Sequence, residues 1–253
     1  MSLKTALIIP DCHIPYHDQC AYQLMLNVAR DLSIDEIVIL GDFADFYAIS
    51  SHGRHPLLMH TLKHEVELVN SKLDELDILF PRAQKYFIEG NHEHRLERYL
   101  SNMASALFGV TETRTLFNLD KRSMWHFLDY GPNQLHSVLG SYLKARHEPV
   151  ASSAKLTAAR ALCSLVYGHI HRIEQSHMVG IEGIDHVAFS VGWLGDKTQD
   201  LIFGYVKGHH QWQLGFGLVY VDPETKYFYH QKIHILTNGR RYSCVANGKL
   251  YSL

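Results

Sequence analysis

The stretch KTALIIPDCH, residues 4–13, decides the fold because a predicted strand in it is followed at once by two polar side chains, Asp11 and His13. Its apolar residues are nearly continuous, which is typical of a strand covered on both faces. The same order recurs in EIVILGD (36–42) and KYFIEGN (85–91). We therefore expect three buried strands, each followed by polar residues.

The segments between these strands have the spacing of helices. Apolar residues recur at intervals of three and four from Tyr22 to Leu32 and again over 58–80, where Pro81 helps to end the pattern. Alternating strands and helices predict an α/β fold with right-handed crossovers. In such folds the carboxyl ends of the strands form the edge at which ligands bind.

The helical pattern fades after about Phe189, and the later segments are rich in glycine and aromatic residues. Strand pieces at 212–217 and 226–235 are joined by a predicted turn at 222–225. We therefore expect a second, mostly antiparallel sheet. No Pro- or Ser-rich linker divides the chain, so residues 1–253 are predicted to form a single domain.

The stretch 98–140 is polar and shows no clear strand pattern. A lid or specificity insertion and an ordinary connecting helix remain as alternatives for it.

The composition limits the partners and the compartment. The formal net charge of −2 gives no global basic field for non-specific nucleic-acid binding, although a local metal centre can supply positive charge. The 4 cysteines show no CxxC spacing, which favours a reducing compartment. No apolar run approaches the roughly 18 residues of a membrane span. We expect a soluble, cytoplasmic protein with no membrane partner.

Five short motifs supply oxygen or imidazole ligands, and most of them stand where an apolar run ends. They are Asp11-Cys-His13, Gly41-Asp42-Phe-Ala-Asp45, Gly90-Asn91-His92-Glu93, Arg146-His147 and Gly168-His169-Ile-His171. In extended backbone, residues two apart point to the same side, so the pair in the first motif and the pair in the last can each reach one ion. Mixed carboxylate and imidazole ligands suit Mn, Fe, Zn or Co.

This ordered set resembles the pattern of the calcineurin-like metallophosphoesterases: DxH, GDxxD, GNH followed by D or E, a single His, and GHxH. It spans residues 11–171. The resemblance implies a four-layer α/β/β/α sandwich of two mixed sheets flanked by helices, with a binuclear metal centre. Asp11, His13 and His171 would hold one divalent ion, and Asn91, His147 and His169 the other, with Asp42 as the bridge.

Two positions depart from the family pattern. Glu148 follows His147 where glycine is common, so His136 competes with His147 as the single-His ligand. We favour His147 because it lies 22 residues before His169 on a predicted strand end. The second motif continues as Asp45-Phe46-Tyr47 and lacks the arginine of the family's protein phosphatases, which disfavours that activity.

The resemblance also implies a mechanism in which a hydroxide between the two ions attacks phosphorus in line with the leaving oxygen. His92 would be a catalytic residue that protonates the leaving oxygen, and Asp45 would raise its basicity. The alternative for Asp45 is a helix cap.

Arg95 and His52 are the candidate substrate-binding residues. Arg95 could lean toward a bound phosphate, and His52 follows the second motif on a predicted loop. In the alternative interpretation, Glu93, Arg95, Glu97 and Arg98 form a solvated helix face.

The sequence thus predicts a metal-dependent phosphoester hydrolase with two divalent ions, Mn being favoured over Fe, Zn, Co or Ni. A phosphodiesterase acting on nucleic acid or nucleotides is the first hypothesis. A phosphomonoesterase acting on a nucleotide, a small phosphate ester or a phosphoprotein is the second. A non-catalytic metal-binding scaffold is the third. The oligomeric state is not indicated.

Overall fold

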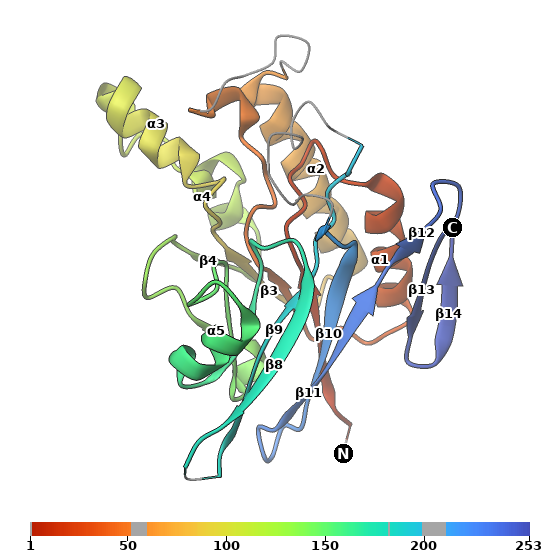
Figure 1. Cartoon of the computed structure of the whole chain (residues 1–253). Helices are drawn as coiled ribbons and strands as arrows, with labels where there is room; N and C mark the ends of the chain where they lie inside the picture. Colours follow the sequence, from red (N-terminus) through yellow and green to blue (C-terminus); the bar gives the residue numbers. More distant parts are fainter. Residues whose placement is uncertain (1, 52–59, 182, 199–210) are drawn as a thin grey trace.

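The computed structural model describes residues 2–51, 60–181, 183–198 and 211–253, and its strands form two large sheets and one small one (Figure 1). The first sheet has the strand order β11-β10-β1-β2-β3-β4. Its parallel centre consists of β1 (Lys4–Ile9), β2 (Glu36–Ile39), β3 (Gln84–Ile88) and β4 (Trp125–Leu128). Two antiparallel pairings add β10 (Gly215–Val221) and β11 (Phe228–His234).

The second sheet has the order β5-β6-β7-β9-β8. Its strands are β5 (His136–Ser137), β6 (Leu143–Arg146), β7 (Ser164–Tyr167), β8 (Ile173–Val179) and β9 (Asp185–Val191). The central three are parallel, and the two edge strands are antiparallel to their neighbours. A small antiparallel sheet of β12 (Leu236–Thr237), β13 (Tyr242–Ala246) and β14 (Lys249–Ser252) lies beside helix α1 (Figure 1).

The side chains of β1 point alternately to the two faces of the first sheet, and this shows how the layers are stacked. Leu7 and Ile9 belong to the core shared with helices α1 (Gln19–Arg30) and α2 (Leu62–Leu79). Ala6 and Ile8 belong to the core between the two sheets. The outer face of the second sheet is covered by α5 (Ala154–Ala161). The four-layer α/β/β/α sandwich is therefore confirmed, with the first sheet buried on both faces.

The helices begin at residues that suit helix starts. Asp18, Thr61 and Ser153 each accept a hydrogen bond from a backbone amide of the first turn of α1, α2 and α5, respectively. α2 ends at Leu79, directly before Phe80 and Pro81, as the sequence pattern indicates. None of the described helices combines the length and the apolar character needed to cross a membrane.

The prediction for the C-terminal strands was wrong about their sheet. β10 and β11 do not build a second sheet but extend the first one, where Leu218 pairs with Leu7. The second sheet is formed by β5 to β9 instead. Strand pairing over a long sequence separation depends on burial of both faces, which a local pattern does not specify.

The stretch 98–140 contains two strands that the sequence pattern did not reveal, because both are short and mixed in polarity. β4 is an edge of the first sheet and β5 an edge of the second. Helices α3 (Arg95–Met103) and α4 (Thr113–Leu116) lie in the chain between the end of β3 and the start of β4. α3 projects from the body of the molecule (Figure 1), and a lid role for this region stays a prediction.

Candidate metal centre

The five motifs meet at one end of the sandwich, because the loops after β1, β2 and β3 face the loops after β6 and β7. Backbone hydrogen bonds connect these loops. The amides of Cys12 and His13 donate to the carbonyl of Asp42 at 3.0 and 2.8 Å. The amide of His169 in turn donates to Oδ1 of Asp11 at 2.8 Å, which joins the second sheet to the first.

Asp11, His13, Asp42 and His171 form the first group of potential ligands, and all four are buried. Nε2 of His13 lies 3.1 Å from Nε2 of His171 and 4.0 Å from Oδ2 of Asp42. Nε2 of His171 lies 3.5 Å from Oδ1 of Asp11. One ion could contact an atom of each residue at this spacing.

A second group shares Asp42 with the first. Oδ2 of Asp42 lies 3.4 Å from Nε2 of His147. Oδ1 of Asn91 lies 2.9 Å from that nitrogen and 2.8 Å from Nδ1 of His169. Asp42 thus stands between two sets of ligand atoms, as a bridging carboxylate would.

The donor atoms fit divalent ions. Within the described residues, Oδ2 of Asp11 is buried without a hydrogen-bond partner, a costly arrangement unless a further group satisfies it. Gly168 is needed beside the carboxylate, because a Cβ there would lie 2.7 Å from Oδ2 of Asp11.

Four predicted ligands have left-handed backbone, with φ of 54°, 48°, 70° and 57°. They are His13, Asp42, His169 and His171. Such conformations are unfavourable for residues other than glycine and gather at functional sites. The strained backbone aims these side chains into the centre.

Two of the imidazoles are oriented by hydrogen bonds from their Nδ1 atoms. Nδ1 of His13 donates to Oδ2 of Asp45 at 2.9 Å. Nδ1 of His147 donates to the carbonyl of Leu40 at 2.8 Å. Each bond leaves Nε2 as the acceptor nitrogen that faces the centre, the usual arrangement of a metal-binding histidine.

Glu93 holds the two central loops together, a role that sequence reasoning missed. Its carboxylate accepts from the amides of Gly90, Asp42 and Ala44 at 2.9, 2.9 and 2.7 Å. It is fully buried, so the interpretation of a solvated helix face was wrong for Glu93 and also for Arg95, which is 8% exposed. The glutamate after Asn91-His92 was the available signal, but its partners are backbone amides that no motif displays.

His92 and Asp45 lie next to the ligand groups. Nδ1 of His92 donates to the backbone carbonyl of Asp45 at 3.1 Å and lies 3.2 Å from its Oδ2. Nε2 of His92 is 3.9 Å from Oδ2 of Asp42. Asp45 therefore contacts both His13 and His92, and it is not the N-cap of a described helix.

Arg95 contacts this pair. Its Nη1 donates to the carbonyl of Asp45 at 2.9 Å and to Oδ1 at 3.3 Å. Its Nη2 lies 3.1 Å from Nε2 of His92. Arg95 thus lies at the rim beside His92, where its contacts position the histidine, and its predicted contact with phosphate stays a prediction.

The charges of the centre support one another. Burial opposes ionisation of Asp42, but the charges of His147 and His92 hold the pKa of its carboxyl well below the usual range. Burial likewise opposes a charged His147, yet Asp42 raises the pKa of its imidazole to about 10. For His92, the carboxylates of Asp42 and Asp45 outweigh burial and raise the pKa. Concentrated negative charge of this kind attracts cations.

His136, the alternative single-His ligand, lies apart from the centre. Nε2 of His136 lies 2.9 Å from Oε1 of Glu36, and its ring stacks on Tyr86. The structure therefore brings His147, and not His136, to Asp42 and Asn91. His52 lies outside the described residues.

Trp193 supports one of the potential ligands. Its ring stacks on His171 with centroids 4.9 Å apart, and Trp212 meets the same imidazole edge-on at 4.4 Å. Both tryptophans are buried. They are core residues that also form a wall of the centre.

Comparison with known proteins agrees with the motifs. The family model described as calcineurin-like phosphoesterase matches residues 4–239. No curated protein matches the sequence.

Solved structures show a weaker likeness. Vacuolar protein sorting 29 from Cryptosporidium parvum is 13% identical at a TM-score of 0.46, with 100% of this chain and 97% of that chain covered. Vps29 from Chaetomium thermophilum is 10% identical at 0.43, with 100% and 95% covered. The phosphoesterase Yfce from E. coli is 16% identical at 0.39, with 90% and 98% covered.

The assignment rests on the family match and not on these structures. That match spans nearly the whole chain, and the five motifs within it converge on one cluster of potential metal ligands. The chain therefore belongs to the calcineurin-like phosphoesterase family, a family of binuclear metal-dependent enzymes.

Proposed function

We propose that the chain hydrolyses phosphodiesters and that His92 delivers the proton that the leaving oxygen requires. The observation that carries this proposal is the position of His92. Its Nε2 lies 3.9 Å from Oδ2 of Asp42, the proposed bridging carboxylate, while its Nδ1 donates a hydrogen bond to the carbonyl of Asp45. A diester with an alkoxide leaving group needs such a proton, because an unprotonated alkoxide leaves slowly.

The ligand groups define the proposed metal sites. Asp11, His13 and His171 would hold one ion, and Asn91, His147 and His169 the other, with Asp42 shared between them. When bound, two divalent ions supply Lewis-acid charge to the phosphoryl oxygens and lower the pKa of a water nucleophile. Mn²⁺ is the favoured ion because the set mixes carboxylate, amide and imidazole donors.

The protein's own residues hold the proton at a defined atom. With Nδ1 of His92 donating to the carbonyl of Asp45, Nε2 is the nitrogen that exchanges a proton with the substrate. Arg95 donates to Asp45, and its Nη2 lies 3.1 Å from Nε2 of His92, which limits rotation of the ring. In this arrangement Asp45 and Arg95 are positioning residues, and His92 is the catalytic one.

The first test replaces His92 with alanine and measures metal content and turnover together. We expect His92→Ala to retain its Mn²⁺ while turnover of a dialkyl phosphate ester, a poor leaving group, falls roughly 10²–10⁴-fold. Bis-p-nitrophenyl phosphate should lose far less, because p-nitrophenolate leaves without a proton.

The control is His126→Ala, which changes an exposed histidine on β4. It should behave like the wild type on both substrates. An equal loss of His92→Ala on both substrates, or no loss on the dialkyl ester, would contradict the proton-transfer role.

The second test compares bis-p-nitrophenyl phosphate with p-nitrophenyl phosphate in the presence of Mn²⁺. The proposal expects the higher kcat/KM on the diester. A strong preference for the monoester would favour a phosphomonoesterase. Absence of bound transition metal together with absence of hydrolysis would favour the non-catalytic scaffold.

A further inference from the structure

Helix α3 separates two chemically different surfaces. Residues three and four apart share one side of a helix, so Arg95, Arg98, Tyr99 and Asn102 lie on one face. Leu96 and Leu100 are buried, at 3% and 5% exposure, on another. The first face is cationic and aromatic and contains no carboxylate.

That face lines a cavity of about 380 Å³, here called the α3 pocket. Its walls are residues 49–51 together with Arg95, Arg98, Tyr99, Asn102 and Met103. The volume falls within the range of small-molecule sites, roughly 300–1,000 Å³.

The α3 pocket borders the candidate metal centre. One wall follows the loop that contains Asp42 and Asp45, and the other follows the loop that contains Asn91 and His92. Arg95 lies at the junction, because it lines the pocket and its Nη2 lies 3.1 Å from Nε2 of His92. A leaving group that takes its proton from His92 would therefore lie beside this pocket.

The side chains of the pocket suit a nucleotide. Tyr99 is 40% exposed and offers an aromatic face on which a base can stack. Asn102 carries an amide donor and acceptor suited to a base edge. Arg98 is exposed and forms no ion pair within the described residues, so its guanidinium is free to bind a phosphate.

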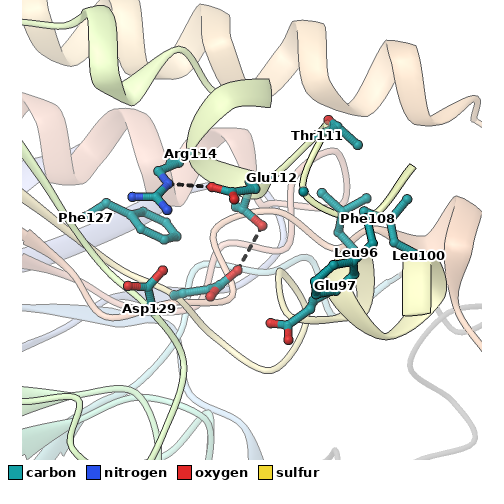
Figure 2. Close-up of a pocket in the computed structure, with 12 residues that line it drawn as sticks. Leu96, Glu97, Leu100, Phe108, Thr111, Glu112, Arg114, Phe127 and Asp129 are labelled. Atoms are coloured by element: carbon teal, nitrogen blue, oxygen red, sulfur yellow. Dashed lines mark hydrogen bonds and ion pairs between the residues drawn. The ribbon is translucent and has the colours of Figure 1, made fainter. Parts of the chain in front are cut away.

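The opposite face of α3 has the contrary charge. A cavity of about 240 Å³ lies there, and the buried Glu89 is among the residues that line it. Figure 2 shows three further carboxylates at this cavity, those of Glu97, Glu112 and Asp129. Its one arginine, Arg114, is paired with Glu112 at 2.6 Å. This acidic cavity is unfavourable for an anionic ligand, whereas the α3 pocket offers cationic side chains.

We propose that the α3 pocket binds the leaving half of the substrate, and that this half is a nucleotide with a second phosphate beyond the scissile one. Tyr99 stacks on the base and Arg98 binds the second phosphate. This inference rests on the proposed phosphodiesterase function, since it names the substrate class of the same centre. A dinucleotide and a longer single strand share the required chemistry.

The test measures equilibrium binding to the Mn²⁺-loaded protein by calorimetry, with no turnover required. The probes are thymidine 3′,5′-bisphosphate and thymidine 5′-monophosphate, which differ by one phosphate. We expect the wild type to bind the bisphosphate about tenfold more tightly, as for one charge-assisted contact. Arg98→Gln should reduce this preference to about one, and Arg160→Gln, which changes an exposed arginine on α5, should keep it.

Tyr99 is tested with the same probes. Tyr99→Leu should weaken both thymidine ligands by roughly tenfold, whereas Tyr99→Phe retains the stacking face and should restore binding. Competition with a tetranucleotide whose phosphorothioate linkages resist hydrolysis separates the two sources of the ligand. Tighter binding than the bisphosphate indicates a single strand, and equal binding indicates a dinucleotide.

The inference is overturned if Arg98→Gln retains the preference for the bisphosphate, or if neither nucleotide binds the wild type at millimolar concentration. Bis-p-nitrophenyl phosphate turnover is measured in parallel. Turnover without nucleotide preference rejects the α3 pocket alone. Nucleotide preference without turnover rejects the hydrolytic function while the pocket stands.

Discussion

The hydrogen atom that serves as the side chain of Gly168 leaves room for the carboxylate of Asp11. A Cβ at this position would lie 2.7 Å from Oδ2 of Asp11, an oxygen with no protein partner in the described chain. The glycine and the aspartate come from different sheets, so this contact couples the position of a potential ligand to the packing of the sandwich. At the scale of single residues, small side chains are therefore as necessary to the centre as the ligands.

Gly168→Ala is expected to displace the Asp11 carboxylate and to weaken Mn²⁺ binding by about 10–100-fold, the usual effect of disturbing the orientation of a ligand. Titration with Mn²⁺ followed by calorimetry measures the loss. Gly131→Ala is the matched control, because a Cβ there meets open space and should leave Mn²⁺ affinity at the wild-type value. Wild-type Mn²⁺ affinity in Gly168→Ala would rule out this role of the glycine.

At the scale of elements, α2 begins with a buried carboxyl group close to the centre. Glu65 lies in its first turn and is fully buried. Burial, together with the charge of Asp45, raises the pKa of Glu65 to about 8, although the backbone amides of Ala48 and Tyr47 favour its charged form. The start of this helix is therefore sensitive to pH.

The direction in which pH changes the free energy of unfolding depends on which state binds the proton of Glu65. Above its ordinary pKa of 4.5 the unfolded chain has lost this proton, whereas the folded chain retains it up to about pH 8. The free energy of unfolding should therefore fall as pH rises from about 4.5 to 8, by up to about 1.4 kcal/mol per pH unit from this group. Above pH 8 the contribution of Glu65 no longer changes.

Glu65→Gln removes this titration. The free energy of unfolding, measured with urea from about pH 5 to 8, should therefore decline less in this variant than in the wild type. Glu67→Gln, an exposed change on the same helix, should follow the wild-type curve. Identical pH dependence of Glu65→Gln and the wild type would show that Glu65 is not protonated in the folded protein.

At the scale of the whole molecule, the candidate metal centre joins the two sheets. Asp11, Asp42 and Asn91 follow strands of the first sheet, whereas His147 and His169 follow strands of the second. An ion bound between them adds contacts that the unfolded chain cannot keep. Metal binding should therefore stabilise the fold as one unit.

Mn²⁺ at 100 times its dissociation constant is expected to raise the free energy of unfolding by about 2.7 kcal/mol per site, and EDTA should reverse the effect. Scanning calorimetry measures the shift in Tm within each variant. Asp42→Asn should lose most of the Mn²⁺-induced shift, whereas Asp120→Asn, an exposed change, should keep it. Equal shifts in the two variants would place Mn²⁺ elsewhere on the protein.

Much of the fold could be predicted because its evidence is local. The parallel strands near 4–9, 36–39 and 84–88 and the helices between them show their periods within a few residues. The motif residues after these strands have defined positions for the same reason. β4 and β5 were missed because these short edge strands contain polar residues and lack the nearly continuous apolar run that marks β2.

The sequence by itself determined the family motifs, the alternating strands and helices, and the chemistry of the potential ligands, since each depends on residues near one another in the chain. Only the tertiary structure decided that β10 joins the first sheet, that His147 and not His136 reaches Asp42, and that Glu93 binds three backbone amides. Each face of α3 likewise lines a cavity only together with residues from other segments of the chain. These features depend on long-range pairing and burial, and a local pattern contains no information about which distant partner a side chain meets.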